Sequence, residues 1–177
     1  GADVVISART EDQLRTVAQQ VAAAGRRAHV VTADLSDLDA VAGLAGEAKD
    51  AFGRLDIVVN NVGGSMPRPF LDTTPNALTR AFEWRVATAR ALTRSAVPRM
   101  MEGGGTGAGV NISSLIGRVG GRGFVAYGTG KGALSHWTRM AAADLAPTVR
   151  VNAIAVGSIA TSALDIVTQD DGLRTAV

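Results

Sequence analysis

The sequence predicts an α/β fold, a doubly wound parallel sheet between layers of helices, and two observations lead to this prediction. Short runs rich in β-branched residues alternate along the chain with longer, alanine-rich segments of helical period. Strands separated by helices form βαβ units, which assemble into three layers, α/β/α. Because the strand segments are almost continuously apolar, we expect the sheet to be buried on both faces.

Five segments have the composition of strands. Each is rich in valine, isoleucine or alanine and is bounded by polar or glycine-containing stretches. The glycine-rich stretch GGGTGAG at 103–109 predicts a loop that leads into the fourth strand. The predicted strands are residues 3–7, 29–32, 56–60, 110–113 and 150–155.

Four longer segments have apolar residues at three- and four-residue spacing, the period of an amphipathic helix. In the third of them, Leu78, Phe82, Ala89 and Leu92 follow this spacing. No internal repeat or linker divides the chain, so we expect residues 1–177 to form a single domain. The predicted helices are residues 11–24, 37–52, 75–101 and 124–145.

The composition argues against several classes of protein. With no cysteine and only two histidines, the chain offers few metal ligands, and we expect no metal site. Its 18 basic and 16 acidic residues nearly balance and the arginines are scattered, which argues against nucleic-acid binding. We find no apolar run of about 18 residues that would span a membrane. Since no basic and apolar leader is visible either, we expect a cytoplasmic protein.

Ligands of doubly wound sheets bind beyond the carboxyl ends of the strands. The residues that follow each predicted strand are therefore the first candidates for a binding site. They are mostly small or polar, which allows a ligand to approach the backbone closely. These stretches are residues 8–10, 33–35, 61–64, 114–118 and 156–161.

Tyr127, the only tyrosine in the chain, precedes Lys131 by four residues and so shares a helix face with it. With two lysines in the chain, chance would place one at this spacing about one time in ninety. A free phenol ionises only near pH ~10, whereas a neighbouring ammonium favours the phenolate and makes a better acid–base group. The pair therefore indicates proton-transfer chemistry.

Ser114 follows the fourth predicted strand, and the residues alone leave two roles open for it. A serine at a strand end is commonly a turn or capping residue. Beside a tyrosine and a lysine, its hydroxyl could instead donate a hydrogen bond to a substrate carbonyl oxygen. We do not expect a hydrolase nucleophile, because the surrounding ISSLIG lacks the Gly-x-Ser-x-Gly pattern.

Taken in order, these motifs resemble those of the short-chain dehydrogenase/reductase family, including members similar to 3-oxoacyl-(acyl-carrier-protein) reductase. Ser114, Tyr127 and Lys131, in NISSLIGRVGGRGFVAYGTGK, resemble the Ser and Tyr-x-x-x-Lys signature of that family. DIVVNNVGG resembles its Asn-Asn-Ala-Gly segment, and RVNAIAVGSIAT its strand followed by Pro-Gly-x-x-x-Thr. The resemblance implies a Rossmann-type fold and an oxidoreductase that interconverts a secondary alcohol and a ketone by hydride transfer.

The resemblance also implies a role for each matching residue. Tyr127 would exchange a proton with the substrate oxygen, and Ser114 would polarise the carbonyl. Lys131 would favour the phenolate and hold the nicotinamide ribose. The residues implied to bind the cofactor are Asp34, Leu35, Asn61, Val62, Gly63, Tyr127, Lys131, Gly157, Ile159 and Thr161.

Arg9 indicates which cofactor is preferred. NAD sites of this kind place an acid after the corresponding strand to bind the ribose 2′-hydroxyl, whereas an arginine suits the 2′-phosphate of NADP. The first predicted strand is followed by Arg9, with no acid before Glu11. We therefore expect Arg9 to bind NADP, with NAD the less favoured cofactor.

The sequence departs from the family pattern at both ends. The first strand, its glycine-rich phosphate turn and the helix after it are not found. That strand is central in the sheet, so we expect the two halves of the sheet to lack the strand that joins them. The final helix and strand of the family are not found either, and we expect a fragment of a longer gene product.

Three single positions also differ from the family. Arg85 stands where the family usually has an asparagine that supports the lysine through a water, so a cation there would compete with Lys131 or require a reorganised relay. The alternative is an exposed helix arginine in a shifted register. Val156 in place of proline and Val62 in place of alanine are smaller changes that remove no contact group.

The sequence leaves two functions open. The first is an NADP-dependent oxidoreductase for a small carbonyl or alcohol substrate. The second is a catalytically silent remnant that acts as a binding or oligomerising subunit. For the complete fold, the resemblance implies a homodimer or homotetramer that pairs through helices 75–101 and 124–145.

Overall fold

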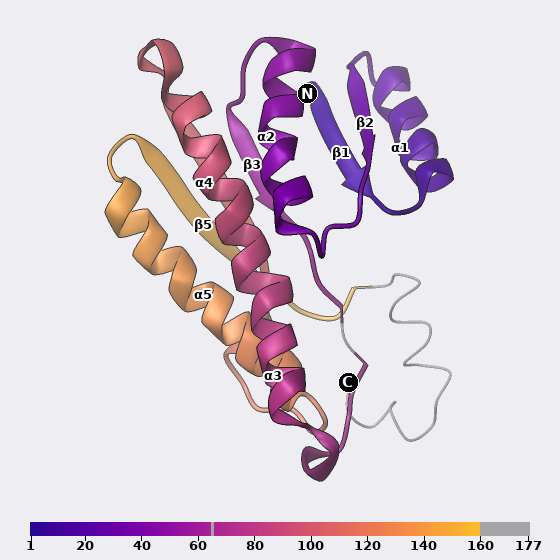
Figure 1. Cartoon of the computed structure of the whole chain (residues 1–177), viewed down its shortest axis with the longest axis vertical. Helices are drawn as coiled ribbons and strands as arrows, with labels where there is room; N and C mark the ends of the chain where they lie inside the picture. The colour runs from indigo at the N-terminus through magenta and orange to yellow at the C-terminus, as the bar shows by residue number, and fades with distance from the viewer. Residues whose placement is uncertain (65, 160–177) are drawn as a thin grey trace.

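Parallel strands form two separate sheets in the part of the chain that the structure describes, residues 1–64 and 66–159 of a computed structural model. The first sheet has the order β1-β2 and the second the order β3-β4-β5 (Figure 1). This confirms the predicted α/β class with parallel strands. The strands are β1 (Val4–Ala8), β2 (Ala28–Thr32), β3 (Ile57–Asn60), β4 (Gly107–Ser114) and β5 (Val149–Val156).

Helices alternate with the strands, as predicted. Apart from the start of β4, the ends of every predicted strand and helix agree with the structure to within one residue. Short 3-10 helices at Phe70–Asp72, Glu102–Gly104 and Leu115–Gly117 lie in the connections. The α-helices are α1 (Glu11–Ala23), α2 (Leu38–Phe52), α3 (Pro75–Phe82), α4 (Thr88–Met101) and α5 (Val125–Leu145).

The predicted helix 75–101 is divided by a π-helical turn, η2, at Glu83–Ala87. A π turn contains more residues than an α turn, so it rotates the faces of the helices on its two sides relative to each other. Ala89 is consequently 1% exposed, whereas Leu78 and Phe82 are 37% and 50% exposed. The predicted helical period is therefore interrupted, and Leu78 and Phe82 do not share a buried face with Ala89.

β4 begins three residues earlier than predicted, inside the stretch expected to be a loop. Gly107 pairs with Val149 of β5, and its N–H donates to the carbonyl oxygen of Thr148 at 3.2 Å. On the other side, the N–H of Ala108 donates to the carbonyl oxygen of Asp56 at 3.0 Å. Pairing with both neighbouring strands therefore overrides the weak strand propensity of glycine.

Polar side chains define where two of the helices begin. At the start of α2, the Asp37 carboxylate accepts hydrogen bonds from the N–H groups of Asp39 at 2.9 Å and Ala40 at 3.3 Å. At the start of α3, the Thr74 hydroxyl accepts from the N–H of Ala77 at 3.2 Å. These N–H groups have no partner inside the helix, so the caps stabilise both helix starts.

Helices α2, α4 and α5 bury one face of the strands. A core of small and branched residues joins Ala45 of α2, Val58 of β3 and Ala96 of α4. On the other face of β3, Ile57 and Val59 are each 57% exposed. The expectation of a sheet buried on both faces is therefore wrong for β3, whereas β1 and β2 are each contacted by both α1 and α2.

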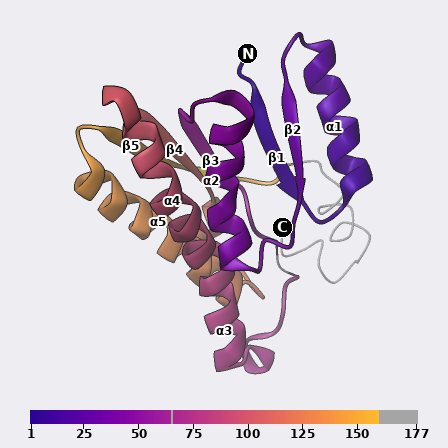
Figure 2. The ribbon, with the colours of Figure 1, turned by 45° about the horizontal axis from the view of Figure 1, so that its top comes forward.

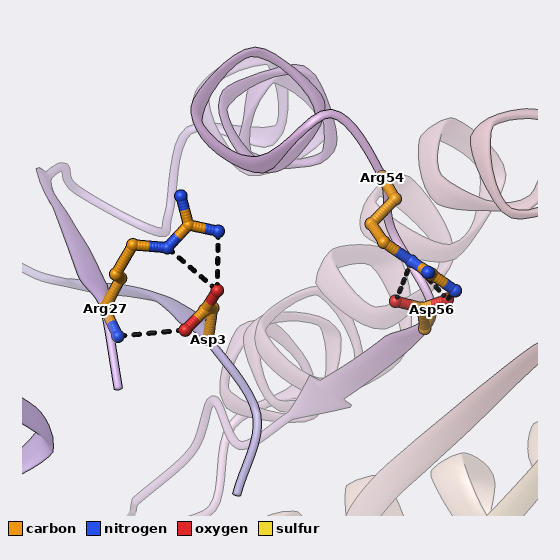
Figure 3. A network of polar contacts seen from close by, with 4 residues as sticks. All are labelled: Asp3, Arg27, Arg54 and Asp56. Atoms are coloured by element: carbon orange, nitrogen blue, oxygen red, sulfur yellow. Dashed lines mark hydrogen bonds and ion pairs between the residues drawn. The ribbon is translucent and has the colours of Figure 1, made fainter. Parts of the chain in front are cut away.

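The two sheets are not hydrogen-bonded to each other within the described ranges, and Figures 1 and 2 show β1 and β3 as neighbours without pairing. A cavity of about 810 Å³ lies between them and is lined by both strands. Ion pairs border it: Arg27 donates to Asp3 at 2.9 Å, and Arg54 to Asp56 at 2.9 Å (Figure 3). The expectation that the halves lack a joining strand is confirmed for these residues, and α2, which contacts β1, β2 and α4, links them instead.

Candidate active site

Tyr127 and Lys131 lie on α5, one turn apart. The Lys131 Nζ is 5.9 Å from the centroid of the Tyr127 ring, and the lysine is only 5% exposed. Its Nζ donates a 2.6 Å hydrogen bond to the carbonyl oxygen of Ile112 in β4. Phe124 packs edge-on against the tyrosine ring, with 5.9 Å between centroids. Contacts to a strand and to the start of the helix thus fix both side chains.

Arg85 brings a second cation to the tyrosine. It is 3% exposed, and its guanidinium carbon lies 4.9 Å from the Tyr127 ring centroid. Nη1 donates to the carbonyl oxygen of Ala81 and Nη2 to that of Gly64, each at 3.1 Å. Nε is buried without a hydrogen-bond partner in the described part of the chain. The alternative of an exposed helix arginine is therefore wrong.

Gly130 allows α5 to approach the arginine closely. A Cβ atom at this position would lie 2.8 Å from the carbonyl oxygen of Ala81 and 2.9 Å from Cδ of Arg85. Both distances are well inside ordinary van der Waals contact. A side chain at position 130 would therefore displace either α3 or the arginine.

The two cations differ in how readily they lose a proton. Burial, together with a smaller effect of the Arg85 charge, lowers the pKa of Lys131 from 10.5 to about 8. Burial also lowers the pKa of Arg85, while its interaction with Tyr127 opposes that change. Since arginine starts from so high a pKa that it stays protonated in proteins, Arg85 keeps its charge where Lys131 begins to lose its proton.

Ser114 is the last residue of β4 and is 6% exposed. Its Oγ accepts a 3.3 Å hydrogen bond from the N–H of Ile116, which leaves the hydroxyl hydrogen available to another acceptor. The preceding Ser113 hydroxyl bonds to the carbonyl oxygen of Lys131 at 2.9 Å and to the Ser135 hydroxyl at 2.6 Å. Ser113, which sequence reasoning missed, therefore anchors the lysine's helix to β4.

A buried chain of amides supports the same region and was also missed. Asn60 of β3 donates to Asn111 of β4 at 2.7 Å, and Asn111 donates to the Thr138 hydroxyl at 2.9 Å. Asn111 is fully buried, at 0% exposed. The sequence does show an asparagine in each of two otherwise apolar strands. Only the strand register, which pairs Asn60 with Asn111, shows that the two are neighbours.

Two predicted cofactor-binding residues lie beyond β1 and β2. Arg9 is exposed directly after β1, and Asp34 lies after β2. The N–H and the hydroxyl of Ser36 each donate to Asp34 at 2.9 Å and lower its pKa, and the charge of Arg9 adds a smaller effect of the same sign. Arg9 and Asp34 therefore share one end of the strands.

Six more predicted residues lie near the same edge. A Cβ atom at Gly63, where φ is 154°, would lie 3.3 Å from Nζ of Lys131, so the backbone after β3 passes close to that lysine. Thr161, also predicted to bind the cofactor, lies outside the described residues. Leu35, Asn61 and Val62 line the cavity between β1 and β3, and Gly157 and Ile159 are exposed after β5.

A second cavity, of about 820 Å³, opens beside Tyr127 and Arg85. Arg68, Arg80 and Glu83 also line it, and all three are exposed. Three arginines against one glutamate give this cavity a positive character. Among residues 1–64 and 66–159, no cluster of acidic and histidine side chains could hold a metal ion, and no helix is long and apolar enough to cross a membrane.

Parallel strands with polar residues at their carboxyl ends define a Rossmann-type α/β protein. A family profile described as short chain dehydrogenase matches residues 1–172. An uncharacterized oxidoreductase of Mycobacterium tuberculosis is 59% identical over 98% of this chain and 66% of its own length. Carbonyl reductase (NADPH) 2 of Sus scrofa is 31% identical over 98% of this chain and 68% of its own length.

One solved structure is a 7α-hydroxysteroid dehydrogenase complexed with NADH and 7-oxo glycochenodeoxycholic acid. It is 33% identical, with a TM-score of 0.88 over 94% of this chain and 65% of that chain. The present chain therefore belongs to the short-chain dehydrogenase family. It spans about two thirds of the length of the curated relatives that it matches.

Proposed function

We propose that the protein is an NADP-dependent oxidoreductase that interconverts a secondary alcohol and a ketone. One observation carries this proposal: the Tyr127 ring has two buried cations beside it, Arg85 at 4.9 Å and Lys131 at 5.9 Å. Cations beside a phenol favour its phenolate, so the group can exchange a proton with a substrate oxygen. Membership of the family supports the same reaction class.

A nicotinamide cofactor would supply or accept the hydride of this reaction. The residues present fit such a group. Because Gly63 has no side chain, the space next to the Lys131 ammonium stays open, whereas a Cβ atom at this position would lie 3.3 Å from Nζ. Lys131 is proposed to hold the ribose hydroxyls next to Tyr127. The other proposed contacts are Arg9, Asp34, Leu35, Asn61, Val62, Gly157 and Ile159.

The preference for NADP rests on Arg9. This arginine is exposed at the end of β1, where a 2′-phosphate would gain a cationic partner. Asp34 accepts two hydrogen bonds from Ser36, so part of its hydrogen-bonding capacity is already used. The relatives do not decide between NADP and NAD, since the name of the carbonyl reductase specifies NADPH and the 7α-hydroxysteroid dehydrogenase structure holds NADH.

The chain's own residues would handle the proton. In reduction, Ser114 donates a hydrogen bond to the ketone oxygen, and Tyr127 transfers its phenolic proton to that oxygen while the carbon receives the hydride. The ketone thereby gains one hydride and one proton and becomes the alcohol. In oxidation, the Tyr127 phenolate takes the hydroxyl proton, and Lys131 and Arg85 stabilise that phenolate beforehand.

The second candidate is a silent binding or oligomerising subunit, because a buried cation, Arg85, lies beside Tyr127 where the resemblance implies an asparagine. With either function we propose a homodimer or homotetramer that pairs through α3, α4 and α5. Leu78 and Phe82 of α3 and Met140 of α5, which are 37%, 50% and 49% exposed, supply apolar surface for this contact.

Titration of the purified chain with NADPH, and with NADH beside it, tests the proposal through cofactor fluorescence. Selective binding of NADPH, followed by turnover of a panel of cyclic and linear ketones that is lost in Tyr127→Phe, supports the oxidoreductase. Binding of neither cofactor by a folded chain favours the silent subunit. Light scattering during size-exclusion chromatography tests the oligomer, and a monomer at micromolar concentration would contradict it.

A further inference from the structure

Arg85 is a buried cation without an acidic partner. No carboxylate forms an ion pair or hydrogen bond with it among the described residues. An uncompensated buried charge destabilises a fold, so an arginine in this position requires some other interaction. The aromatic ring of Tyr127, 4.9 Å from the guanidinium carbon, is the group that it faces.

The surrounding structure holds the guanidinium firmly. The π turn η2 carries Arg85, and the carbonyl oxygens of Ala81 and Gly64 accept hydrogen bonds from its two terminal nitrogens. Gly130 leaves room for its Cδ, where a Cβ atom would come within 2.9 Å. Three separate segments of the chain therefore fix one cation against one ring.

We propose that Arg85 is a positioning residue for the proposed reaction, a permanent cation that stabilises the phenolate form of Tyr127 through the face of its ring. This inference rests on the proposed oxidoreductase function. Arg85 and Lys131 would then both stabilise the Tyr127 phenolate, which Lys131 would otherwise stabilise alone. A negative ring attracts a cation over its face more strongly than a neutral ring does, because charge adds to the quadrupole.

Other charged groups near the ring do not replace this cation. Lys131, on the same helix, loses its proton more readily because its pKa is lowered to about 8. Arg68, Arg80 and Glu83 line the cavity beside Tyr127 but are exposed, so solvent weakens their effect on the ring. Arg85 is the member of this set that is both buried and permanently charged.

Coulomb's law sets the expected size of the effect. The guanidinium carbon lies 4.9 Å from the ring centroid, and the phenolate oxygen lies outside the ring, so a unit charge changes the ratio of phenolate to phenol by roughly threefold with the dielectric constant of water. Burial lowers the effective dielectric constant and raises this factor. Removal of the charge should therefore reduce the ratio by roughly threefold or more.

The experiment is a phenolate absorbance titration of the whole chain, which needs neither cofactor nor substrate. Because Tyr127 is the only tyrosine, the signal belongs to it alone. The variants are Arg85→Gln, which keeps N–H donors for the two carbonyl oxygens, and Arg85→Lys, which keeps a cation. Arg90→Gln, at an exposed arginine of α4, is the matched control. Far-ultraviolet circular dichroism at each pH checks that the chain stays folded.

The proposal expects the phenolate to phenol ratio to fall by roughly threefold or more in Arg85→Gln and to recover in Arg85→Lys. The ratio should stay at the wild-type value in Arg90→Gln. An unchanged ratio in folded Arg85→Gln overturns the proposal. If the Arg85 variants do not fold, Lys131→Met decides: a ratio above that of the urea-unfolded chain supports Arg85, and a ratio equal to it overturns the proposal. A chain that fails to bind NADPH but shows these ratios refutes the proposed function alone.

Discussion

Replacing Lys131 by methionine is expected to stabilise the folded chain near neutral pH, although it removes a proposed catalytic group. The lysine is 5% exposed, and burial is the main cause of its lowered pKa. A group whose charged form is disfavoured by the fold lowers stability while it carries that charge. Methionine has a similar length and no charge, so it removes the penalty with little change in packing.

The magnitude follows from the pKa. A change from 10.5 to about 8 corresponds to about 3 kcal/mol, at 1.36 kcal/mol per pH unit. Loss of the hydrogen bond to the Ile112 carbonyl oxygen offsets about 1 kcal/mol of this. We therefore expect a net gain of about 2 kcal/mol near neutral pH.

The sign of the pH dependence is fixed by proton binding. Between pH 8 and pH 10.5 the unfolded chain binds the lysine proton and the folded chain releases it, so wild-type stability rises with pH across this window. Above pH 10.5 neither state holds the proton, and the penalty is gone. The advantage of Lys131→Met should then disappear, leaving the variant about 1 kcal/mol less stable through the lost hydrogen bond.

Urea unfolding followed by circular dichroism, at neutral pH and above pH 10.5, measures this difference. Lys49→Met is the matched control, because Lys49 is the other lysine and lies on the surface in a 2.7 Å ion pair with Glu102. Because this ion pair is largely exposed, its loss should change stability little at either pH. A stability difference between wild type and Lys131→Met that is the same at both pH values would refute the reasoning.

Three further predictions follow from the site and its support. Tyr127→Phe should reduce turnover about a hundredfold or more while cofactor fluorescence still reports binding, because only the proton donor is lost; equal turnover would contradict the role of Tyr127. Arg9→Glu should weaken NADPH binding at least about tenfold with little effect on NADH, and an equal loss for both cofactors would count against a 2′-phosphate contact. Asn111→Ala should lower the free energy of unfolding by about 2 to 4 kcal/mol, because it leaves the buried Asn60 amide without its acceptor and creates a cavity, while the Thr138 hydroxyl keeps its bond to the Leu134 carbonyl oxygen. Thr138→Val, which removes only one end of the chain, should cost less, and the reverse order would contradict this account.

The sequence predicted the secondary structure well because its two periodicities are distinct. Strand runs and helical spacing placed β1, β2, β3, β5 and the outer ends of the four predicted helices within one residue, but not the π turn that divides the third of them. The start of β4 could not be predicted, because the hydrogen bonds of Gly107 to β5 come from strand pairing and not from local propensity. The exposed faces of Ile57 and Val59 were missed for a related reason, since an apolar run does not say which faces are covered.

The candidate site was predictable in part. The spacing of Tyr127 and Lys131 placed both on one helix, one turn apart, because i and i+4 positions are neighbours on a helix. A regular helix would place Arg85 on the same face as Phe82 and Ala89, but its burial was not expected because arginine is rarely buried without an ionic partner. The π turn at Glu83–Ala87 was not predictable either; it breaks the regular period, and Phe82 is exposed while Arg85 is buried.

The position of each group in the two sheets implies that proton chemistry and cofactor selection can be separated in this chain. Tyr127 and Lys131 belong to α5, which contacts β4 and β5, and Arg85 belongs to η2, which contacts α5. Arg9 and Asp34, in contrast, follow strands of the β1-β2 sheet. No strand pairing transmits the position of one sheet to the other within the described ranges, whereas α2 contacts both strands of the first sheet and helix α4 of the second. Loosening the contact of α2 with α4, for example by Ala45→Gly in their shared core, should therefore weaken NADPH binding more than it changes the Tyr127 phenolate signal. Equal loss of both would show that the two sheets act as one unit despite their separate hydrogen bonding.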